Sequence, residues 1–311
     1  MNERTIWKNG QILPEKEAFY SIYDSSLMFG DTCFEMMRTF NKQTFNLWEH
    51  IERLFKSLRS LEIQIPYTFD DLFNAHENLI IHNRYSFKKD DEIRTLINVS
   101  RGILPIYQEL LEDKGEANII IACFPLRYIT KGMSRFYRTG VSAIVPSQRA
   151  IPEHLLDAKI KSRSRQHYKV ANLEIARQDK DAWPLLLDPD GFVAESTGSN
   201  FFIVKNNFKL LTPKPINCLK GVSRDHVICL ARKMGMKVIE TDITLYDVYN
   251  AREAFFTCTP YSIMPCTRIN GMPIGEGKVG GKTIQITEKW FESVKCDFIS
   301  QMEAWDADCR T

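Results

Sequence analysis

Apolar residues recur at helical spacing in one stretch of the first third of the chain. From Trp48 to Leu61 they stand at positions 48, 51, 54, 55, 58 and 61, and this spacing predicts an amphipathic helix. A second helix is predicted over residues 68–83. His50 and Arg53 are three residues apart in the first helix and so share part of one face. On this pattern alone we expect both on the solvated polar edge of the helix.

Strands are predicted where β-branched and aromatic residues run together between turn signals. The dipeptide Asn-Gly, at 9–10 and again at 270–271, favours the type I′ turn of a β-hairpin, because that turn needs positive φ angles. The run 117–124 is almost entirely apolar, which is typical of a strand buried on both faces. Further strands are predicted over residues 33–40, 93–102, 141–145, 209–213, 238–240 and 254–259.

The chain reads as if organised around the stretch from Lys161 to Asn200. Its predicted elements are, in order, a helix over 170–177, a strand over 183–187, a turn at 188–191, and strands over 192–195 and 201–204. Glu195 ends the second of these strands, and Asn200 precedes the third. One lysine, one glutamate and one asparagine thus belong to a predicted β-hairpin and the helix before it.

Two more helices are predicted, the first from Ser223, a candidate N-cap, to Lys233, and the second over 290–305. Helices and strands mix in both halves, so the predicted fold class is α+β, with mixed α/β character, in two domains. The run Ile-Thr-Lys-Gly-Met-Ser at 129–134 interrupts the pattern. We therefore expect an N-terminal α/β domain over 1–128, a linker over 129–136 and a C-terminal domain over 137–311.

Composition and charge narrow the class of protein. Of 311 residues, 26% are charged and 44% hydrophobic, an ordinary balance for a globular chain. The net charge is +2 with no single-sign run, so nucleic acid is not the expected partner. The eight cysteines include no Cys-x-x-Cys pair, which favours reduced thiols in the cytoplasm over disulfides or a metal site. No signal peptide or membrane-spanning run is apparent, so no membrane association is expected.

A candidate anion site lies where the Gly-Val-Ser turn at 221–223 opens a helix. Free backbone N–H groups and the positive end of the helix dipole attract phosphate there. Every helix has such an end, so this feature alone is a weak signal. The hydroxyls of Thr257 and Thr259 could add donors, and Arg53 could supply positive charge.

Eight groups of residues, in chain order, carry a resemblance to a known family. The first four are Trp-Lys-Asn-Gly at 7–10, Phe-Gly-Asp at 29–31 with Phe-Glu at 34–35, His-Ile-Glu-Arg-Leu at 50–54 with Ser57, and Ser-Arg-Gly at 100–102. The others are Ile-Lys-Ser at 160–162, Asp-Gly-Phe-Val-Ala-Glu at 190–195 with Asn-Phe-Phe at 200–202, Leu-Lys-Gly-Val-Ser-Arg-Asp at 219–225, and Gly271 to Gly277. Together they resemble the fold-type IV pyridoxal-phosphate enzymes, or class IV aminotransferases. That family includes branched-chain and D-amino-acid aminotransferases and aminodeoxychorismate lyase. The family fold has a small N-terminal α/β domain and a larger C-terminal domain with a barrel-like β core.

The resemblance implies roles for individual residues, with pyridoxal 5′-phosphate (PLP) as cofactor. Lys161 is similar in placement to the Schiff-base lysine, which must be neutral when it attacks. Glu195 matches the glutamate that pairs with the pyridine nitrogen, and such a carboxylate makes the ring a better electron acceptor. The other cofactor-binding residues implied are Arg53, Asn200, Val222, Ser223 and Thr259, and the candidate substrate-binding residues are Phe34, Arg38, Arg94, Arg101, Arg163, Arg165 and Pro260.

Alternatives remain at several positions. Lys159 would face the same way as Lys161 on a strand, whereas Lys169 falls inside the expected helix. Many relatives carry a tyrosine four or five residues after the lysine, where this chain has Arg165 and Gln166, and Tyr168 comes too late by simple count. The Thr-Ala pair of branched-chain enzymes becomes Thr-Pro at 259–260, and proline removes a backbone donor.

The arginines at 101, 163 and 165 have two interpretations: a pocket for a carboxylate or dicarboxylate, or a structural ion-pair cluster. For the whole chain, the favoured hypothesis is a PLP-dependent aminotransferase that moves an amino group between an amino acid and a 2-keto acid. A lyase of the aminodeoxychorismate lyase type and a catalytically silent ligand-binding relative are the alternatives. The resemblance also implies a homodimer.

Overall fold

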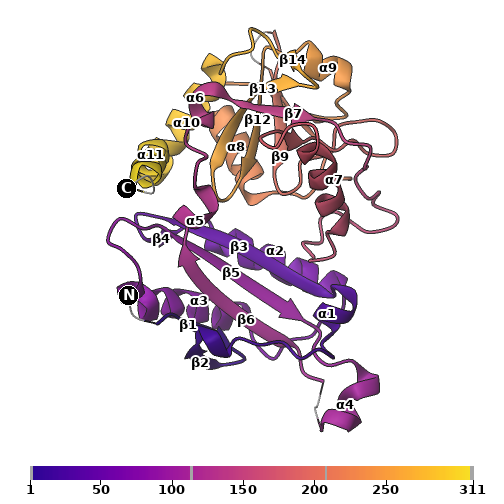
Figure 1. Ribbon diagram of the computed structural model, residues 1–311, viewed down its shortest axis with the longest axis vertical. Coiled ribbons are helices and arrows are strands. Elements are labelled where there is room, and N and C mark those ends of the chain that lie inside the picture. Colours follow the sequence, from indigo (N-terminus) through magenta and orange to yellow (C-terminus); the bar gives the residue numbers. More distant parts are fainter. Residues whose placement is uncertain (1–2, 113–114, 207–208, 309–311) are drawn as a thin grey trace. The chain divides into compact units, whose positions relative to one another are not determined.

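The computed structural model describes residues 3–112, 115–206 and 209–308 (Figure 1). The chain divides into two compact units. The first contains Met1–Tyr128 and Ile160–Arg165, and the second contains Ile129–Lys159 and Gln166–Thr311. The short segment Ile160–Arg165 therefore belongs to the first unit, although the chain on both sides of it belongs to the second.

The first unit is built on a six-stranded sheet in the order β2-β1-β6-β5-β3-β4, with every neighbouring pair antiparallel. The strands are β1 (Thr5–Lys8), β2 (Gln11–Pro14), β3 (Thr32–Phe40), β4 (Gln43–Thr44), β5 (Ile93–Ser100) and β6 (Asn118–Pro125). The first predicted hairpin is confirmed: Lys8 faces Gln11, and the turn residues Asn9 and Gly10 have φ angles of 46° and 90°.

Two long helices cover one face of this sheet, α2 (Leu47–Ser60) and α3 (Phe69–Asn83) (Figure 1). Both were predicted from the sequence, α2 from its apolar spacing, and both are confirmed. Leu54 and Leu79 pack with Met37 and Ile97 in the core of the unit. Side chains alternate along a strand, so Phe34 and Arg38 of β3 lie on the face opposite that of Met37. Shorter helices are α1 (Ser25–Phe29), α4 (Pro105–Leu111) and α5 (Arg127–Thr130).

The segment Ile160–Arg165 extends this sheet along the edge of β3. The Phe34 N–H donates to the Lys161 carbonyl, and the Arg163 N–H donates to the Thr32 carbonyl, each at 2.9 Å. Cys33 and Ser162 form an antiparallel bridge between these bonds. Because side chains alternate, this pairing puts Lys161 and Arg163 on the same face as Phe34.

The second unit contains an eight-stranded mixed sheet in the order β11-β10-β9-β12-β13-β7-β8, with β14 paired to β13. Its strands are β7 (Val141–Ile144), β8 (Trp183–Pro184), β9 (Asn200–Val204), β10 (Leu210–Pro213), β11 (Val238–Thr241), β12 (Glu253–Cys258), β13 (Ser262–Ile269) and β14 (Met272–Pro273). Its helices are α6 (Phe136–Thr139), α7 (Gln166–Ala176), α8 (Val222–Lys233), α9 (Leu245–Tyr249), α10 (Gly281–Val294) and α11 (Phe298–Asp308). Two sheets with helices confirm the predicted mixed fold class.

Three local predictions were wrong. The hairpin over 183–195 is reduced to the two residues of β8 and an isolated bridge between Leu187 and Val193. The N-cap of α8 is Gly221 rather than Ser223. The terminal helix is two helices, because Lys295 adopts a left-handed φ of 53° and ends α10.

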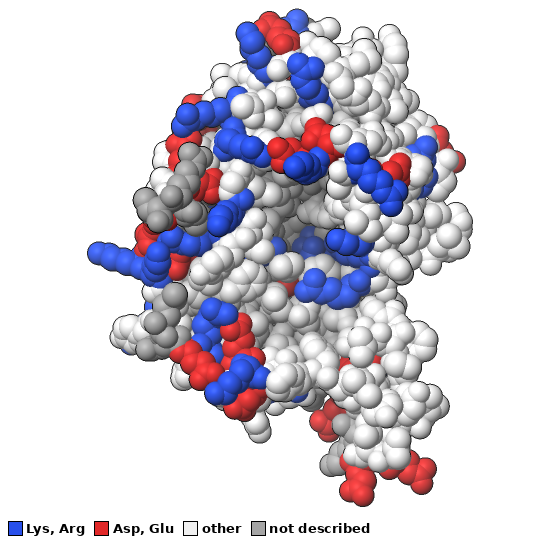
Figure 2. All heavy atoms as spheres, in the orientation of Figure 1, with Lys and Arg blue, Asp and Glu red and all other residues white. Residues whose placement is uncertain are grey.

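Acidic and basic side chains are interspersed on the face of the molecule drawn in Figure 2, which agrees with the small net charge of +2. Among the described residues, no helix is long and apolar enough to cross a membrane.

Candidate active site

Lys161 is fixed by its backbone on the first unit. Its N–H donates to the Ser57 hydroxyl of α2 at 3.2 Å, and its carbonyl accepts from Phe34. Its Nζ lies 4.8 Å from the centre of the Phe34 ring. Lys159 differs, since its ammonium pairs with Glu153 at 2.9 Å and Asp157 at 3.0 Å. Hydrogen bonding to Glu153 and pairing with Asp157 raise the pKa of Lys159 and keep it protonated.

His50 and Arg53 of α2 converge on Glu35 of β3. Arg53 donates from Nε and Nη2 to the two carboxylate oxygens of Glu35, at 2.6 and 2.8 Å. His50 Nδ1 lies 2.7 Å from the same carboxylate. His50 and Glu35 are buried, and the side chain of Arg53 is only 12% exposed. The expectation of a solvated helix edge was therefore wrong: these residues face the sheet because a carboxylate there compensates the charge.

Burial and charge pairing together set the protonation states of Glu35 and His50. Burial alone would raise the pKa of Glu35, but Arg53 and His50 hold it well below its ordinary value. Burial lowers the pKa of His50 to about 4, against the opposing pull of Glu35. His50 is thus neutral at pH 7, and its Nδ1–H must donate because an ionised carboxylate can only accept. Its Nε2 is buried without a hydrogen-bond partner among the described residues.

Glu195 lies at the centre of a hydrogen-bonded cluster in the second unit. The Tyr168 hydroxyl donates to its Oε1 at 2.5 Å. Its Oε2 accepts from Asn200 Nδ2 at 3.2 Å and from the Leu219 N–H at 3.1 Å. Asn200 also donates to the Leu219 carbonyl at 2.7 Å, so it ties the strand β9 to the turn before α8. Three donors therefore orient this buried carboxylate and favour its ionised form.

The start of α8 is open to an anion. Its N-cap, Gly221, has no side chain to cap the first turn. Ser223, in the first turn, is 3% exposed, and its hydroxyl has no hydrogen-bond partner among the described residues. A Cβ atom on Gly221 would lie 2.1 Å from Asn200 Oδ1, so only glycine lets the turn approach the Glu195 cluster. An orphaned hydroxyl beside uncapped N–H groups is the donor set that a phosphate needs.

The turn between β12 and β13 carries the other hydroxyls. The Thr257 hydroxyl donates to the Ser262 carbonyl at 2.6 Å and so closes the turn, whereas Thr259 and Pro260 lie in the turn itself. A pocket of about 400 Å³ in this unit is bordered by the turn and by the loop after Glu195, through Ser196, Thr197, Gly198, Ser199, Cys258 and Pro260.

The candidate substrate arginines fall into separate groups in the first unit. Arg38 and Arg94 face each other across β3 and β5 and are buried, with Arg38 stacked on Phe40 at 3.9 Å. Arg163 and Arg165 lie over Phe34 instead, at 3.7 and 5.0 Å from its ring centre.

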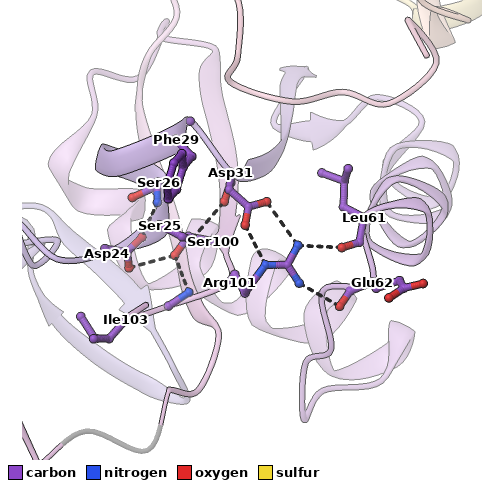
Figure 3. A network of polar contacts seen from close by, with 12 residues as sticks. Asp24, Ser25, Ser26, Phe29, Asp31, Leu61, Glu62, Ser100, Arg101 and Ile103 are labelled. Atoms are coloured by element: carbon purple, nitrogen blue, oxygen red, sulfur yellow. Dashed lines mark hydrogen bonds and ion pairs between the residues drawn. The ribbon is translucent and has the colours of Figure 1, made fainter. Parts of the chain in front are cut away.

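Arg101 has different partners from Arg163 and Arg165. Its Nε donates to Asp31 at 2.7 Å, and its other nitrogens donate to the Leu61 and Glu62 carbonyls at 2.7 and 3.1 Å (Figure 3). These contacts tie the end of α2 to the loop after α1, which is a structural role. We therefore leave Arg101 out of the candidate substrate site.

Two contacts of the candidate site were not found from the sequence. Tyr168 comes too late by simple count, yet one turn of α7 brings it to Glu195. Glu35 has no role in the sequence-based assignment, although it pairs with Arg53. A charged residue inside a largely apolar strand was the available signal for a buried ion pair.

Comparison with known proteins identifies the family. Residues 32–269 match the family model described as amino-transferase class IV. The putative branched-chain-amino-acid aminotransferase of Methanocaldococcus jannaschii is 34% identical over 92% of this chain and 94% of its own. The branched-chain amino acid aminotransferase of T.th., solved with N-(5′-phosphopyridoxyl)-L-glutamate, is 26% identical and covers 94% of this chain and 95% of its own, with a TM-score of 0.82. The same enzyme has been solved with pyridoxamine 5′-phosphate, with a TM-score of 0.83.

The chain therefore belongs to the class IV aminotransferase family. It is a PLP-dependent aminotransferase with the fold-type IV architecture, as the resemblance implied. Neither a lyase nor a silent binding protein is favoured by these matches.

Proposed function

We propose that this aminotransferase uses Lys161 to hold PLP and to move the substrate proton, and that it acts on an amino acid and a 2-keto acid. The observation that carries the assignment of the lysine is the contrast between Lys159 and Lys161. Two carboxylates hold Lys159 as a cation, whereas Lys161 Nζ shares the Phe34 ring with the guanidinium groups of Arg163 and Arg165. A lysine must be deprotonated to attack a carbonyl or to accept a proton.

The residues of the second unit fit the two polar ends of PLP. Glu195, held by three donors, is suited to pair with the pyridine nitrogen. Ser223 Oγ and the uncapped first turn of α8, beginning at Val222, suit the phosphate, with Thr259 in the β12–β13 turn as a further donor. Bound PLP supplies an electron sink for the pair that is released when the substrate Cα–H bond breaks.

The residues of the first unit supply the base and its surroundings. Lys161 Nζ takes the Cα proton and delivers it to the carbon that carries the amino group in the other half of the exchange. Arg53 is assigned to the cofactor phosphate; Glu35 already binds its Nε and Nη2 and so fixes the direction of the guanidinium.

Assembly and location form part of the same proposal. The family resemblance supports a homodimer, which the mass of the protein in solution would test. Seven cysteines are free thiols in the described part of the chain, and this supports a reducing compartment such as the cytoplasm. Relatives are named for branched-chain amino acids, so these belong in any substrate panel.

The experiment is an absorption titration of the purified protein with PLP, followed by L- and D-amino acids. A visible band that an amino acid converts to the pyridoxamine form is expected, and that amino acid identifies the donor. Lys161→Ala should remove the band and keep the circular dichroism spectrum, while Lys159→Ala, the matched control, should keep both. A band that survives in Lys161→Ala but not in Lys159→Ala would reverse the assignment.

A further inference from the structure

Three basic side chains surround one aromatic ring on the first unit. Lys161 and Arg163 belong to the stretch paired with β3, and alternation places them on the face that carries Phe34. Lys161 Nζ and the guanidinium carbons of Arg163 and Arg165 lie 4.8, 3.7 and 5.0 Å from the centre of the Phe34 ring. The two guanidinium charges repel each other, so an anion beside them is favoured.

Within this cluster, the hydrogen bonds of Arg163 orient its guanidinium for binding. Its Nε and Nη2 both donate to Asn98 Oδ1, at 3.1 and 2.7 Å. Asn98 stands opposite Phe34 on β5, so strand and ring hold the guanidinium in one plane. Among the described residues, no carboxylate pairs with Arg163, in contrast to Arg101, which pairs with Asp31.

A guanidinium has five N–H donors, and Asn98 uses two of them. Two hydrogens on Nη1 and one on Nη2 remain. One from each nitrogen can bind a carboxylate through two parallel hydrogen bonds. Tyr20 lies close enough to Arg163 for the positive charge of the guanidinium to oppose the effect of burial on the pKa of the tyrosine. The Tyr20 hydroxyl is buried without a hydrogen-bond partner among the described residues, and burial raises its pKa, so it remains a neutral donor.

We propose that Arg163, held by Asn98 and Phe34, binds an acidic group on the side chain of the substrate, and so selects dicarboxylic amino acids over aliphatic ones. The inference rests on the proposed function, because it takes Lys161 as the reacting lysine. Arg163 is two residues from Lys161 on the same face, which puts the proposed carboxylate site next to the reacting amine. Arg163 thereby acts as a specificity-determining residue for the second acidic group.

The kinetic test compares L-glutamate with L-glutamine and L-leucine in Arg163→Gln and Arg163→Lys. Glutamine has the shape of glutamate without the charge. Arg163→Gln should lower kcat/KM for glutamate about 10- to 100-fold, mainly through KM, and change it less than about threefold for the other two donors. Arg163→Lys keeps a positive charge but cannot form the two parallel hydrogen bonds. Its kcat/KM for glutamate should lie between those of the unmodified protein and Arg163→Gln. Arg84→Gln is the matched control, since Arg84 also stacks on a ring of this unit, Tyr85, at 4.5 Å.

A second readout does not depend on turnover. Isothermal titration of the PLP-loaded protein with glutarate, and with pentanoate as its monocarboxylate partner, measures binding alone. Glutarate should bind more tightly than pentanoate to the unmodified protein, and Arg163→Gln should remove the difference. Retention of that difference in Arg163→Gln, or an equal loss of kcat/KM for all three donors, would overturn the inference. Arg163-dependent glutarate binding without half-transamination of any amino acid would refute the proposed function and leave the binding site standing.

Discussion

Replacing His50 with glutamine should change how the stability of the protein depends on pH. Burial lowers the pKa of His50 from its ordinary 6.5 to about 4. The unfolded chain therefore takes up a proton at His50 between these pH values, and the folded chain does not. The contribution of neutral His50 to the free energy of unfolding is fully present above pH 6.5 and is lost as the pH falls towards 4.

The expected loss follows from the pKa shift. Each pH unit in that window removes about 1.4 kcal/mol, so lowering the pH from 7.5 to 5 removes about 2 kcal/mol through His50 alone. At pH 7.5, His50→Gln should be about 1–3 kcal/mol less stable, because the buried carboxylate of Glu35 loses its donor. At pH 5 this gap should narrow by about 2 kcal/mol, since the variant lacks the titrating group.

The assay is urea denaturation of the cofactor-free protein at pH 7.5, 6.5, 5.5 and 5. Removing PLP keeps its own pH-dependent binding out of the comparison. His82→Gln, at an exposed position of α3, controls for the loss of a histidine as such. Parallel stability curves for His50→Gln and the unmodified protein would refute the assignment of a neutral, buried His50.

Three further outcomes test the candidate site. Glu195→Gln should keep PLP bound but lower kcat roughly 100-fold, the scale of one lost electrostatic contact, and unchanged turnover would contradict the assignment to the pyridine nitrogen. Ser223→Ala should weaken PLP binding about five- to tenfold in an equilibrium titration, without lowering the melting temperature of the cofactor-free protein, because its hydroxyl has no partner among the described residues. Arg101→Ala should reduce the free energy of unfolding by about 1 kcal/mol and leave KM unchanged, and a raised KM would return Arg101 to the substrate site.

Patterns that depend on neighbouring residues were predictable from the sequence. The two Asn-Gly hairpins are present because the turn chemistry is local to two residues. The helix α2 follows from apolar spacing alone, and α3 begins after Thr68, whose side chain caps it. The family resemblance was also readable, because its motifs keep their order along the chain.

Other features were decided by contacts between distant parts of the chain. Ser223 looks like an N-cap by residue type, but the N-cap is Gly221, two residues earlier, where the turn passes close to Asn200. Tyr168 is too late by counting, since a count assumes an extended chain and α7 already begins at Gln166.

By itself, the sequence determined the mixed fold class, the family and its cofactor, because these follow from local periodicity and from motifs in a set order. Only the tertiary structure decided which polar residues act together. It brought His50 and Arg53 to Glu35, committed Arg101 to backbone carbonyls, and added the segment Ile160–Arg165 to the sheet of the first unit. The reason is that burial and pairing of charges depend on partners tens of residues away, and spacing along the chain does not encode those distances.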